Sequence, residues 1–115
     1  EAARASDWMG LHCYWQDETQ MNSPADGRGY EEYRRRYPDK LIFITEFSNP
    51  SPNVDYATKG QQYNRYYQSL RTVPGLGAAF SFVQSASSYF PNEVWRLEDG
   101  TLTGIATAVA QRQFV

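Results

Sequence analysis

The stretch Leu41-Ile42-Phe43-Ile44-Thr45-Glu46 is a continuous apolar run that leads directly into a carboxylate. Runs of this kind, rich in β-branched residues, are typical of strands that are buried on both faces, as in parallel sheets. Residues 8–15 and residues 78–83 form two further strand-like runs. We therefore predict three strands, at residues 8–15, 41–45 and 78–83.

Helical patterns separate these strands. Tyr30, Tyr33 and Tyr37 fall on one face of a short helix that ends at or before Pro38, because a residue before proline avoids helical geometry. Residues 1–5 have the character of a helix already under way.

The longest helix is predicted to begin at Asn53 or Asp55, both good N-caps, and to stop at Pro74-Gly75. Its apolar stripe consists of Tyr56, Gly60, Tyr63, Tyr67 and Leu70. The stripe of a final helix consists of Leu102, Ile105, Ala106, Val109 and Ala110.

Strands that alternate with helices predict an α/β fold with a parallel sheet and right-handed crossovers. Two architectures fit: a small doubly wound sheet, or three consecutive βα units of a TIM barrel. The helical character of residues 1–5 favours the barrel. Since a complete barrel needs about 250 residues, the second architecture would be an incomplete barrel from which more than half is missing.

Composition excludes several classes of function. The net charge is −2 with both signs interspersed, and the densest basic run, Arg34-Arg35-Arg36, is interpreted as a solvated helix face, so no nucleic-acid partner is expected. One cysteine and one histidine are too few for a structural zinc site or an internal disulfide. No apolar run approaches the roughly 20 residues that span a bilayer. We expect no metal, no organic cofactor and no membrane partner.

Polar and aromatic residues lie at the carboxyl end of each predicted strand or in the loop after it. Parallel α/β folds bind their ligands at this end of the sheet. The candidate site residues are His12, Tyr14, Trp15, Glu46, Asn49, Gln84 and Trp95. Glu46 could attack an anomeric carbon as a nucleophile; the alternative is a glutamate that merely opens a surface loop.

His12 and Tyr14 are two residues apart and therefore point to the same side of a strand. A tyrosine hydroxyl beside a carboxylate can hold it ionised and oriented; the alternative is a core histidine and a packed tyrosine. Trp15, if it begins a loop, and Trp95 could be platforms on which a sugar ring stacks. Packing over the end of a barrel would explain Trp95 equally well.

The motifs His12-x-Tyr14, Ile44-Thr45-Glu46-Phe47 and Phe80-Ser81-Phe82, in this order, resemble strands six to eight of clan A glycoside hydrolases, which are retaining (β/α)₈ enzymes. Trp95-Arg96-Leu97 and the segment 99–103 resemble the usual ending of that clan. The resemblance extends over residues 7–112. It implies that Glu46 is the nucleophile, that Tyr14 donates a hydrogen bond to it and that His12 lines the central sugar subsite.

The chain departs from the clan in two ways. Val83-Gln84-Ser85 stands where many members have a tryptophan, so Trp95 or another aromatic residue would have to replace it. The clan's acid/base glutamate, in an Asn-Glu pair after strand four, would lie before Glu1, and Glu18 or Glu93 would be improvised substitutes.

The resemblance therefore implies that residues 1–115 are the C-terminal fragment of a glycoside hydrolase catalytic (β/α)₈ barrel. This fragment would be part of a retaining glycosidase for an oligo- or polysaccharide and would be inactive as this chain alone. It also favours secretion. A non-catalytic glycan-binding or scaffold domain of the same fold is the first alternative, and a complete small α/β binding module is the second. Because a slice of barrel leaves sheet edges and one sheet face uncovered, we expect the chain to associate with copies of itself or with the rest of its barrel.

Overall fold

The structure is a computed structural model that describes residues 1–85 and 88–112. Its elements, in order, are α1 (Ala2–Ala5), β1 (Trp8–Tyr14), α2 (Glu18–Met21), α3 (Tyr30–Arg36), β2 (Leu41–Ser48), α4 (Tyr56–Leu70), β3 (Leu76–Ser81) and α5 (Gly104–Ala110).

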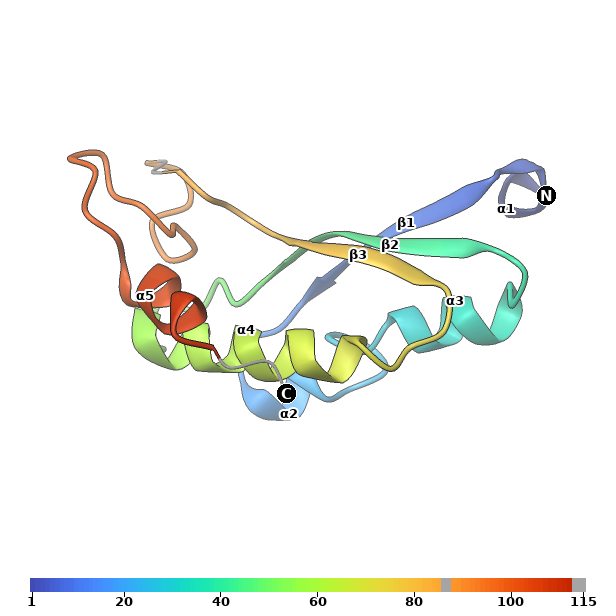
Figure 1. Cartoon of the computed structure of the whole chain (residues 1–115), viewed down its shortest axis with the longest axis horizontal. Helices are drawn as coiled ribbons and strands as arrows, with labels where there is room; N and C mark the ends of the chain where they lie inside the picture. The colour runs from blue at the N-terminus through green and yellow to red at the C-terminus, as the bar shows by residue number, and fades with distance from the viewer. Residues whose placement is uncertain (86–87, 113–115) are drawn as a thin grey trace.

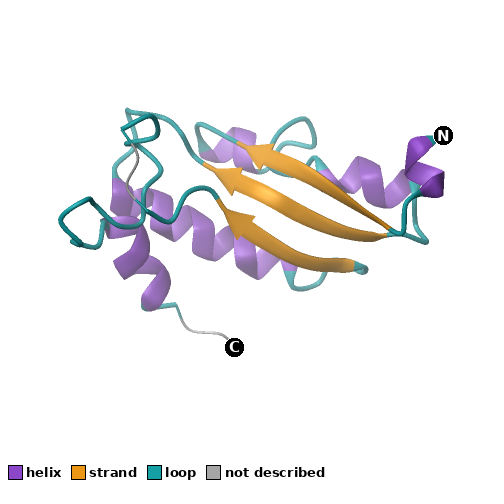
Figure 2. Cartoon of the chain, turned by 90° about the horizontal axis from the view of Figure 1, so that it is seen from above, coloured by secondary structure: helices purple, strands orange, loops and turns teal. Residues whose placement is uncertain are grey.

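The strands form one parallel sheet in the order β1-β2-β3, so each strand pairs with its neighbour in the sequence. All the strands run in the same direction, and long loops gather at their carboxyl ends (Figure 2). This arrangement confirms the predicted α/β fold with parallel strands, an open sheet consistent with part of a TIM barrel. Among the described residues, no helix combines the length and the hydropathy needed to cross a membrane.

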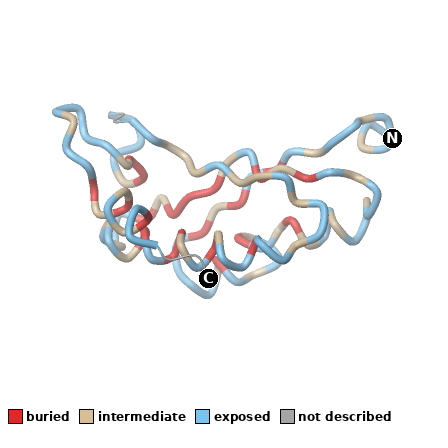
Figure 3. The backbone as a smooth tube through the Cα atoms, viewed as in Figure 1, coloured by how far each residue is buried: buried red, intermediate tan, exposed pale blue. Residues whose placement is uncertain are grey.

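The helices α2, α3 and α4 lie on one side of the sheet, and α5 packs against α4 (Figure 1). The buried residues lie mainly between this helical layer and the sheet (Figure 3). The core cluster consists of Leu11, Cys13, Trp15, Met21, Tyr30, Ile42, Ile44, Phe47, Tyr63, Tyr66, Leu70, Ile105 and Val109. Because each fully buried aliphatic or aromatic side chain contributes about 1.5–3 kcal/mol, this layer is the main source of the stability of the fold.

The ends of α4 follow local rules. Asp55 caps the helix: its carboxylate accepts a hydrogen bond of 2.7 Å from the amide of Thr58. Beyond the other end, Gly75 has a φ of 72°, a conformation that favours glycine, and the chain then enters β3. Both features lie where the sequence predicts them.

One local expectation is wrong, and one short helix was not predicted. Leu102 does not belong to the last helix, which begins at Gly104, and its side chain is exposed. The short helix α2 was not predicted; the Asp17 side chain caps it by accepting a hydrogen bond of 2.8 Å from the amide of Gln20. A helix of four residues is too short to show an apolar periodicity in the sequence.

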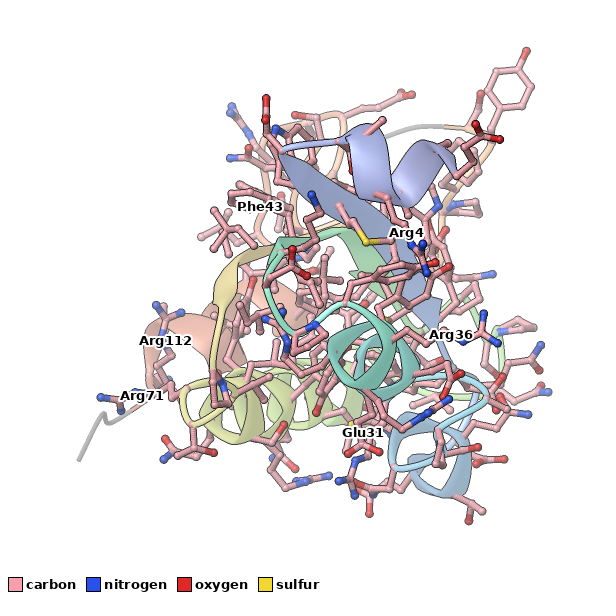
Figure 4. All side chains as sticks on the ribbon, turned by 90° about the vertical axis from the view of Figure 1, so that its right-hand side faces the viewer. Arg4, Glu31, Arg36, Phe43, Arg71 and Arg112 are labelled. Atoms are coloured by element: carbon pink, nitrogen blue, oxygen red, sulfur yellow. The ribbon has the colours of Figure 1, made fainter. Side chains whose placement is uncertain are left out.

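Within residues 1–85 and 88–112, no layer of helices covers the other face of the sheet. Trp8 and Phe43 pack edge to face there, with ring centroids 5.0 Å apart. Viewed along the strands, Phe43 lies on the side of the sheet away from α3 (Figure 4). Trp8, Leu41 and Phe80 are exposed large apolar residues of the strands. In a complete TIM barrel, the equivalent face of the sheet lines the interior.

Candidate active site

A β-bulge decides which way Glu46 points. Leu11 is paired with Ile44, but the next residue of β1, His12, is paired with Glu46, so Thr45 is an extra residue in β2. Ile44 is buried toward the helices, and strict alternation would send Glu46 the same way. The bulge instead puts Glu46 beside His12 on the uncovered face, in agreement with the use of bulges to re-aim side chains near active sites.

Tyr14 is hydrogen-bonded to Glu46. Its hydroxyl donates a hydrogen bond to Oε2 of the carboxylate. Burial, together with the hydrogen bond and the negative charge of Glu46, raises the pKa of Tyr14 well above its usual range. The phenol therefore stays protonated, and stays a donor, at neutral and moderately alkaline pH.

His12 is the second neighbour of Glu46. Its Nδ1 lies 3.5 Å from the same Oε2, and the ring stands edge-on to Tyr14 with centroids 6.0 Å apart. The His12 side chain is 54% exposed and the Glu46 side chain 34%. Both are therefore accessible, which does not fit a core histidine or a carboxylate sealed in the interior. Among the described residues, no hydrogen bond or ion pair reaches Oε1 of Glu46.

Glu46 lies in a groove of about 590 Å³, which we call the Glu46 groove. The residues that line it are Tyr14, Glu46, Pro50, Phe82, Tyr89, Phe90, Pro91, Asn92 and Glu93. Most of them come from the segment after β3, where Phe82 and Phe90 pack edge to face with centroids 4.8 Å apart. A groove with apolar walls and a few converging polar groups is the usual form of a small-molecule site.

The position of Trp15 differs from the prediction. Its side chain is 1% exposed, stacks on Phe47 at 5.8 Å and donates a hydrogen bond of 3.0 Å to Gln62. The alternation of β1 continues through this residue, so Trp15 points to the helices as Leu11 and Cys13 do. This burial in the core does not fit the predicted sugar-stacking platform at Trp15.

Asn49 is likewise structural. It is fully buried, and its side-chain amide donates to the Gln62 side chain at 2.9 Å and to the Gln16 carbonyl at 3.3 Å. Its Oδ1 accepts a hydrogen bond from the amide of Ser51. These partners occupy the polar atoms of Asn49, which does not fit the predicted contact with substrate.

Gln84 and Trp95 do not line the Glu46 groove. Gln84 is exposed, and its carbonyl accepts hydrogen bonds from the amides of Trp95 and Arg96. Trp95 is half-buried against the core, with its ring centroid 6.3 Å from that of Tyr63, and its buried Nε1 has no partner among the described residues. This position fits packing over the end of the sheet; the substrate role of Gln84 stays a prediction.

Glu93 and Phe90 were not predicted as substrate-contacting residues, although both belong to the groove. Both lie in an irregular segment, for which sequence periodicity says nothing. Glu18, the other substitute considered for the acid/base, is bound to Arg65 on the helical side and is remote from the groove lining. Within the described ranges, no three His, Cys, Asp or Glu side chains form a cluster that could hold a metal ion.

The arrangement is suited to chemistry on a sugar. Tyr14 and His12 both contact Oε2 of Glu46, and Oε1 is directed to no described partner. A carboxylate held through one oxygen can use the other for attack on an electrophilic carbon. The aromatic walls offer flat apolar surfaces of the kind that pack against the C–H faces of a pyranose ring.

Comparisons with known proteins agree with the fold. No family model matches the chain, and no curated protein matches it by sequence. Among solved structures, the chain is similar to a GH128 (subgroup VI) exo-β-1,3-glucanase from Aureobasidium namibiae, with a TM-score of 0.63 and 20% sequence identity. The match covers 88% of this chain and 40% of that enzyme, so the chain spans less than half of its neighbour. The chain thus shares the fold of the matched part of that enzyme.

Proposed function

We propose that this chain is the nucleophile-bearing part of a retaining glycosidase that hydrolyses O-glycosidic bonds in an oligo- or polysaccharide. The observation that carries the proposal is the contact of Glu46 with both Tyr14 and His12 on the uncovered face of the sheet. The resemblance of these motifs to clan A enzymes and the glycoside hydrolase fold of the solved neighbour support the same assignment.

In this mechanism Oε1 of Glu46 attacks the anomeric carbon while the bond to the leaving sugar breaks. A covalent glycosyl ester forms, and water then hydrolyses it. Tyr14 orients the carboxylate through its hydrogen bond to Oε2. His12, which is exposed beside Glu46, contacts the sugar in the reacting subsite.

The similar solved structure suggests a substrate class to test. The solved neighbour is named as an enzyme that acts on β-1,3-glucan, and we propose β-linked glucan oligosaccharides as the first substrates to test. Phe90 is 42% exposed in the groove wall and takes the stacking role predicted for Trp15.

A retaining enzyme needs a second carboxyl group about 5 Å from the nucleophile, and that group must be able to reach the leaving oxygen. Glu93 shares the groove but is 5% exposed and accepts a hydrogen bond from Ser48, so it is poorly placed to protonate a leaving group. We propose that another part of the barrel supplies the acid/base residue.

The test compares the protein, in its complete barrel, with its Glu46→Gln and Glu46→Ala variants on aryl β-glucosides and β-1,3-linked oligosaccharides. Loss of the nucleophile should lower kcat by roughly 10³-fold or more. Azide should restore part of the rate in Glu46→Ala by replacing the carboxylate and giving a glycosyl azide. Glu98→Gln is the matched control, because Glu98 is exposed and lies outside the groove.

Trapping of the intermediate adds evidence that does not depend on steady-state rates. A 2-deoxy-2-fluoroglucoside should label the peptide that contains Glu46, and no label should appear in Glu46→Gln. Equal hydrolysis rates in the unchanged protein and in Glu46→Gln would contradict the proposal. They would favour a glycan-binding or scaffold domain of the same fold.

A further inference from the structure

Glu93 is an unusual residue to find beneath a surface groove. It is 5% exposed, although it belongs to the irregular segment between β3 and α5. Its amide donates a hydrogen bond of 3.3 Å to the carbonyl of Phe90, which closes a turn in the groove wall. Glutamate is almost never fully buried unless it is paired, so the contacts of this carboxyl group call for an explanation.

The first contact joins Glu93 to the strand that carries Glu46. The hydroxyl of Ser48 donates a hydrogen bond to Oε1 of Glu93, and Ser48 is fully buried. Ser48 lies two positions after Glu46 on β2, beyond the bulge. The two carboxyl groups of the Glu46 groove are therefore both held by hydroxyl groups, Glu46 by Tyr14 and Glu93 by Ser48.

Lys59 supplies a buried positive charge nearby. Its side chain comes from α4 and is 1% exposed. Nζ donates hydrogen bonds of 2.7 Å to the carbonyl of Ser51 and of 2.6 Å to the carbonyl of Asn92. The ammonium group thus ties the loop after β2 to the segment that carries Glu93. Burial lowers the pKa of Lys59, while the negative charges of Glu93 and Asp55 oppose that effect.

Several titratable groups act on Glu93. Burial is the main cause that raises its pKa above the usual range; Ser48 and Lys59 counteract the rise, and the charge of Glu46 adds to it. Burial is the main cause that raises the pKa of Tyr14 on β1 and of Tyr63 on α4, and the negative charge of Glu93 adds to the rise in both. The charge of Glu46 therefore acts on Glu93, and the charge of Glu93 acts on Tyr14, the hydrogen-bond partner of Glu46.

We propose that Glu93 is a positioning residue of the Glu46 site, a buried carboxyl group that is hydrogen-bonded to Ser48 and whose protonation is coupled to the charge of Glu46. When Glu46 is ionised, Glu93 keeps its proton more firmly, since a second negative charge in a poorly solvated groove is costly. When Glu46 is neutral, Glu93 gives up its proton more readily.

The inference deepens the proposed function and rests on it for its catalytic consequence. Formation of the glycosyl ester converts the Glu46 carboxylate into a neutral group as the bond from Oε1 to the anomeric carbon forms. The coupling then makes Glu93 more acidic in the intermediate than in the free site. Easier release of the Glu93 proton in the intermediate would offset part of the negative charge that Glu46 loses.

The coupling can be measured without any enzymatic activity. The 115-residue chain is prepared with ¹³C at the glutamate side-chain carboxyl carbon, and its resonances are followed by NMR from acidic to neutral pH. The Glu93 resonance is assigned as the one missing in Glu93→Gln. In Glu46→Gln, which mimics the neutral carboxyl group, the midpoint of the Glu93 titration should fall by roughly 0.5–1 pH unit.

Glu32→Gln is the matched control. Glu32 is bonded to Arg35 and Arg36 on α3 and does not line the groove, so its loss should leave the Glu93 midpoint unchanged. Lys59→Met, which removes the opposing cation, should raise the midpoint. Glu46 is partly exposed, so Glu46→Gln keeps the fold and decides the matter even where Lys59→Met unfolds the chain.

A Glu93 midpoint that is the same in the unchanged chain and in Glu46→Gln overturns the inference. The outcomes also separate the two proposals. Coupling without hydrolysis by the complete barrel leaves the inference standing and removes the glycosidase. Hydrolysis that depends on Glu46, with no coupling, removes the inference alone.

Discussion

The hydroxyl of Tyr14 donates a hydrogen bond to Oε2 of Glu46, a contact between residues 32 positions apart on neighbouring strands. Tyr14 ends β1, and Glu46 follows the bulge in β2. The contact therefore requires parallel pairing, the observed register and the extra residue Thr45 together. It joins the two residues on which the proposed chemistry depends.

Removal of this hydrogen bond should impair catalysis more than stability. In the complete barrel, Tyr14→Phe should lower kcat by roughly 10–10²-fold, because Glu46 loses the hydrogen-bond donor that orients it. The exposed Tyr33 provides the control, Tyr33→Phe, for which kcat should not change. A kcat of Tyr14→Phe equal to that of the unchanged protein would show that the hydrogen bond has no part in the reaction.

Truncation of Trp15 should affect stability, whereas truncation of Phe90 should affect substrate binding. Trp15→Ala removes a fully buried core side chain and should lower the free energy of unfolding by about 3–5 kcal/mol. Phe90→Ala removes a partly exposed ring from the groove wall; it should change stability little and raise KM for oligosaccharides. Urea unfolding and steady-state kinetics measure the two effects. The reverse pattern would restore Trp15 as the stacking platform.

Stability should decline at alkaline pH. Burial raises the pKa of several core tyrosines, of which Tyr66 is 2% exposed and donates a hydrogen bond of 2.6 Å to the carbonyl of Gly27. The unfolded chain ionises its phenols near pH 10, whereas the folded chain holds these protons to higher pH. The stabilisation is therefore complete below about pH 10 and is lost as the pH rises above it.

Tyr66→Phe tests that origin. The variant should lose about 1 kcal/mol of stability at pH 7, because the hydrogen bond to Gly27 is removed. It should also show a shallower loss of stability above pH 10, as one ionisable group fewer is buried. Urea unfolding at a series of pH values measures both. An equally steep decline in Tyr66→Phe and in the exposed control Tyr33→Phe would assign the alkaline loss to other groups.

The contact between α4 and α5 leaves no room for a methyl group at Gly60. A Cβ there would lie 2.6 Å from the Cβ of Ala108 and 2.9 Å from the carbonyl oxygen of Ile105. Gly60→Ala should therefore destabilise the chain by about 1–3 kcal/mol, although alanine is the better helix former. Gln61→Ala, at the exposed neighbouring position, should be neutral or slightly stabilising in the same unfolding assay. Stabilisation by Gly60→Ala would mean that α5 can move away from α4.

The uncovered face of the sheet is a candidate surface for association of the chain with itself or with the rest of its barrel. The expectation that the chain pairs with copies of itself or with the rest of its barrel stays a prediction, motivated by exposed Trp8, Leu41 and Phe80. Sedimentation of the 115-residue chain at increasing concentration should give a rising mass, and Phe80→Ser should weaken that rise. A mass that stays monomeric throughout would support the alternative of a complete small α/β module.

Much of the fold could be predicted because its signals are local. The apolar run that begins at Leu41, the Asp55 cap and the Pro74-Gly75 stop each act through neighbouring residues, so they predict the order of strands and helices. From that order, the parallel sheet and its carboxyl-end site follow by general rules. The meeting of His12, Tyr14 and Glu46 was likewise predicted, from the motifs and their resemblance to a family.

The sequence by itself therefore determined the α/β order and the strand end that carries Glu46. Only the tertiary structure decided the bulge that turns Glu46 toward Tyr14, the burial of Trp15 in the core and the closeness of Glu93 to the same groove. The physical reason is that periodicity reports which face a side chain takes within a regular element. A bulge shifts that phase, and an irregular segment has none, so their side chains are placed by packing between parts of the chain that are far apart in sequence.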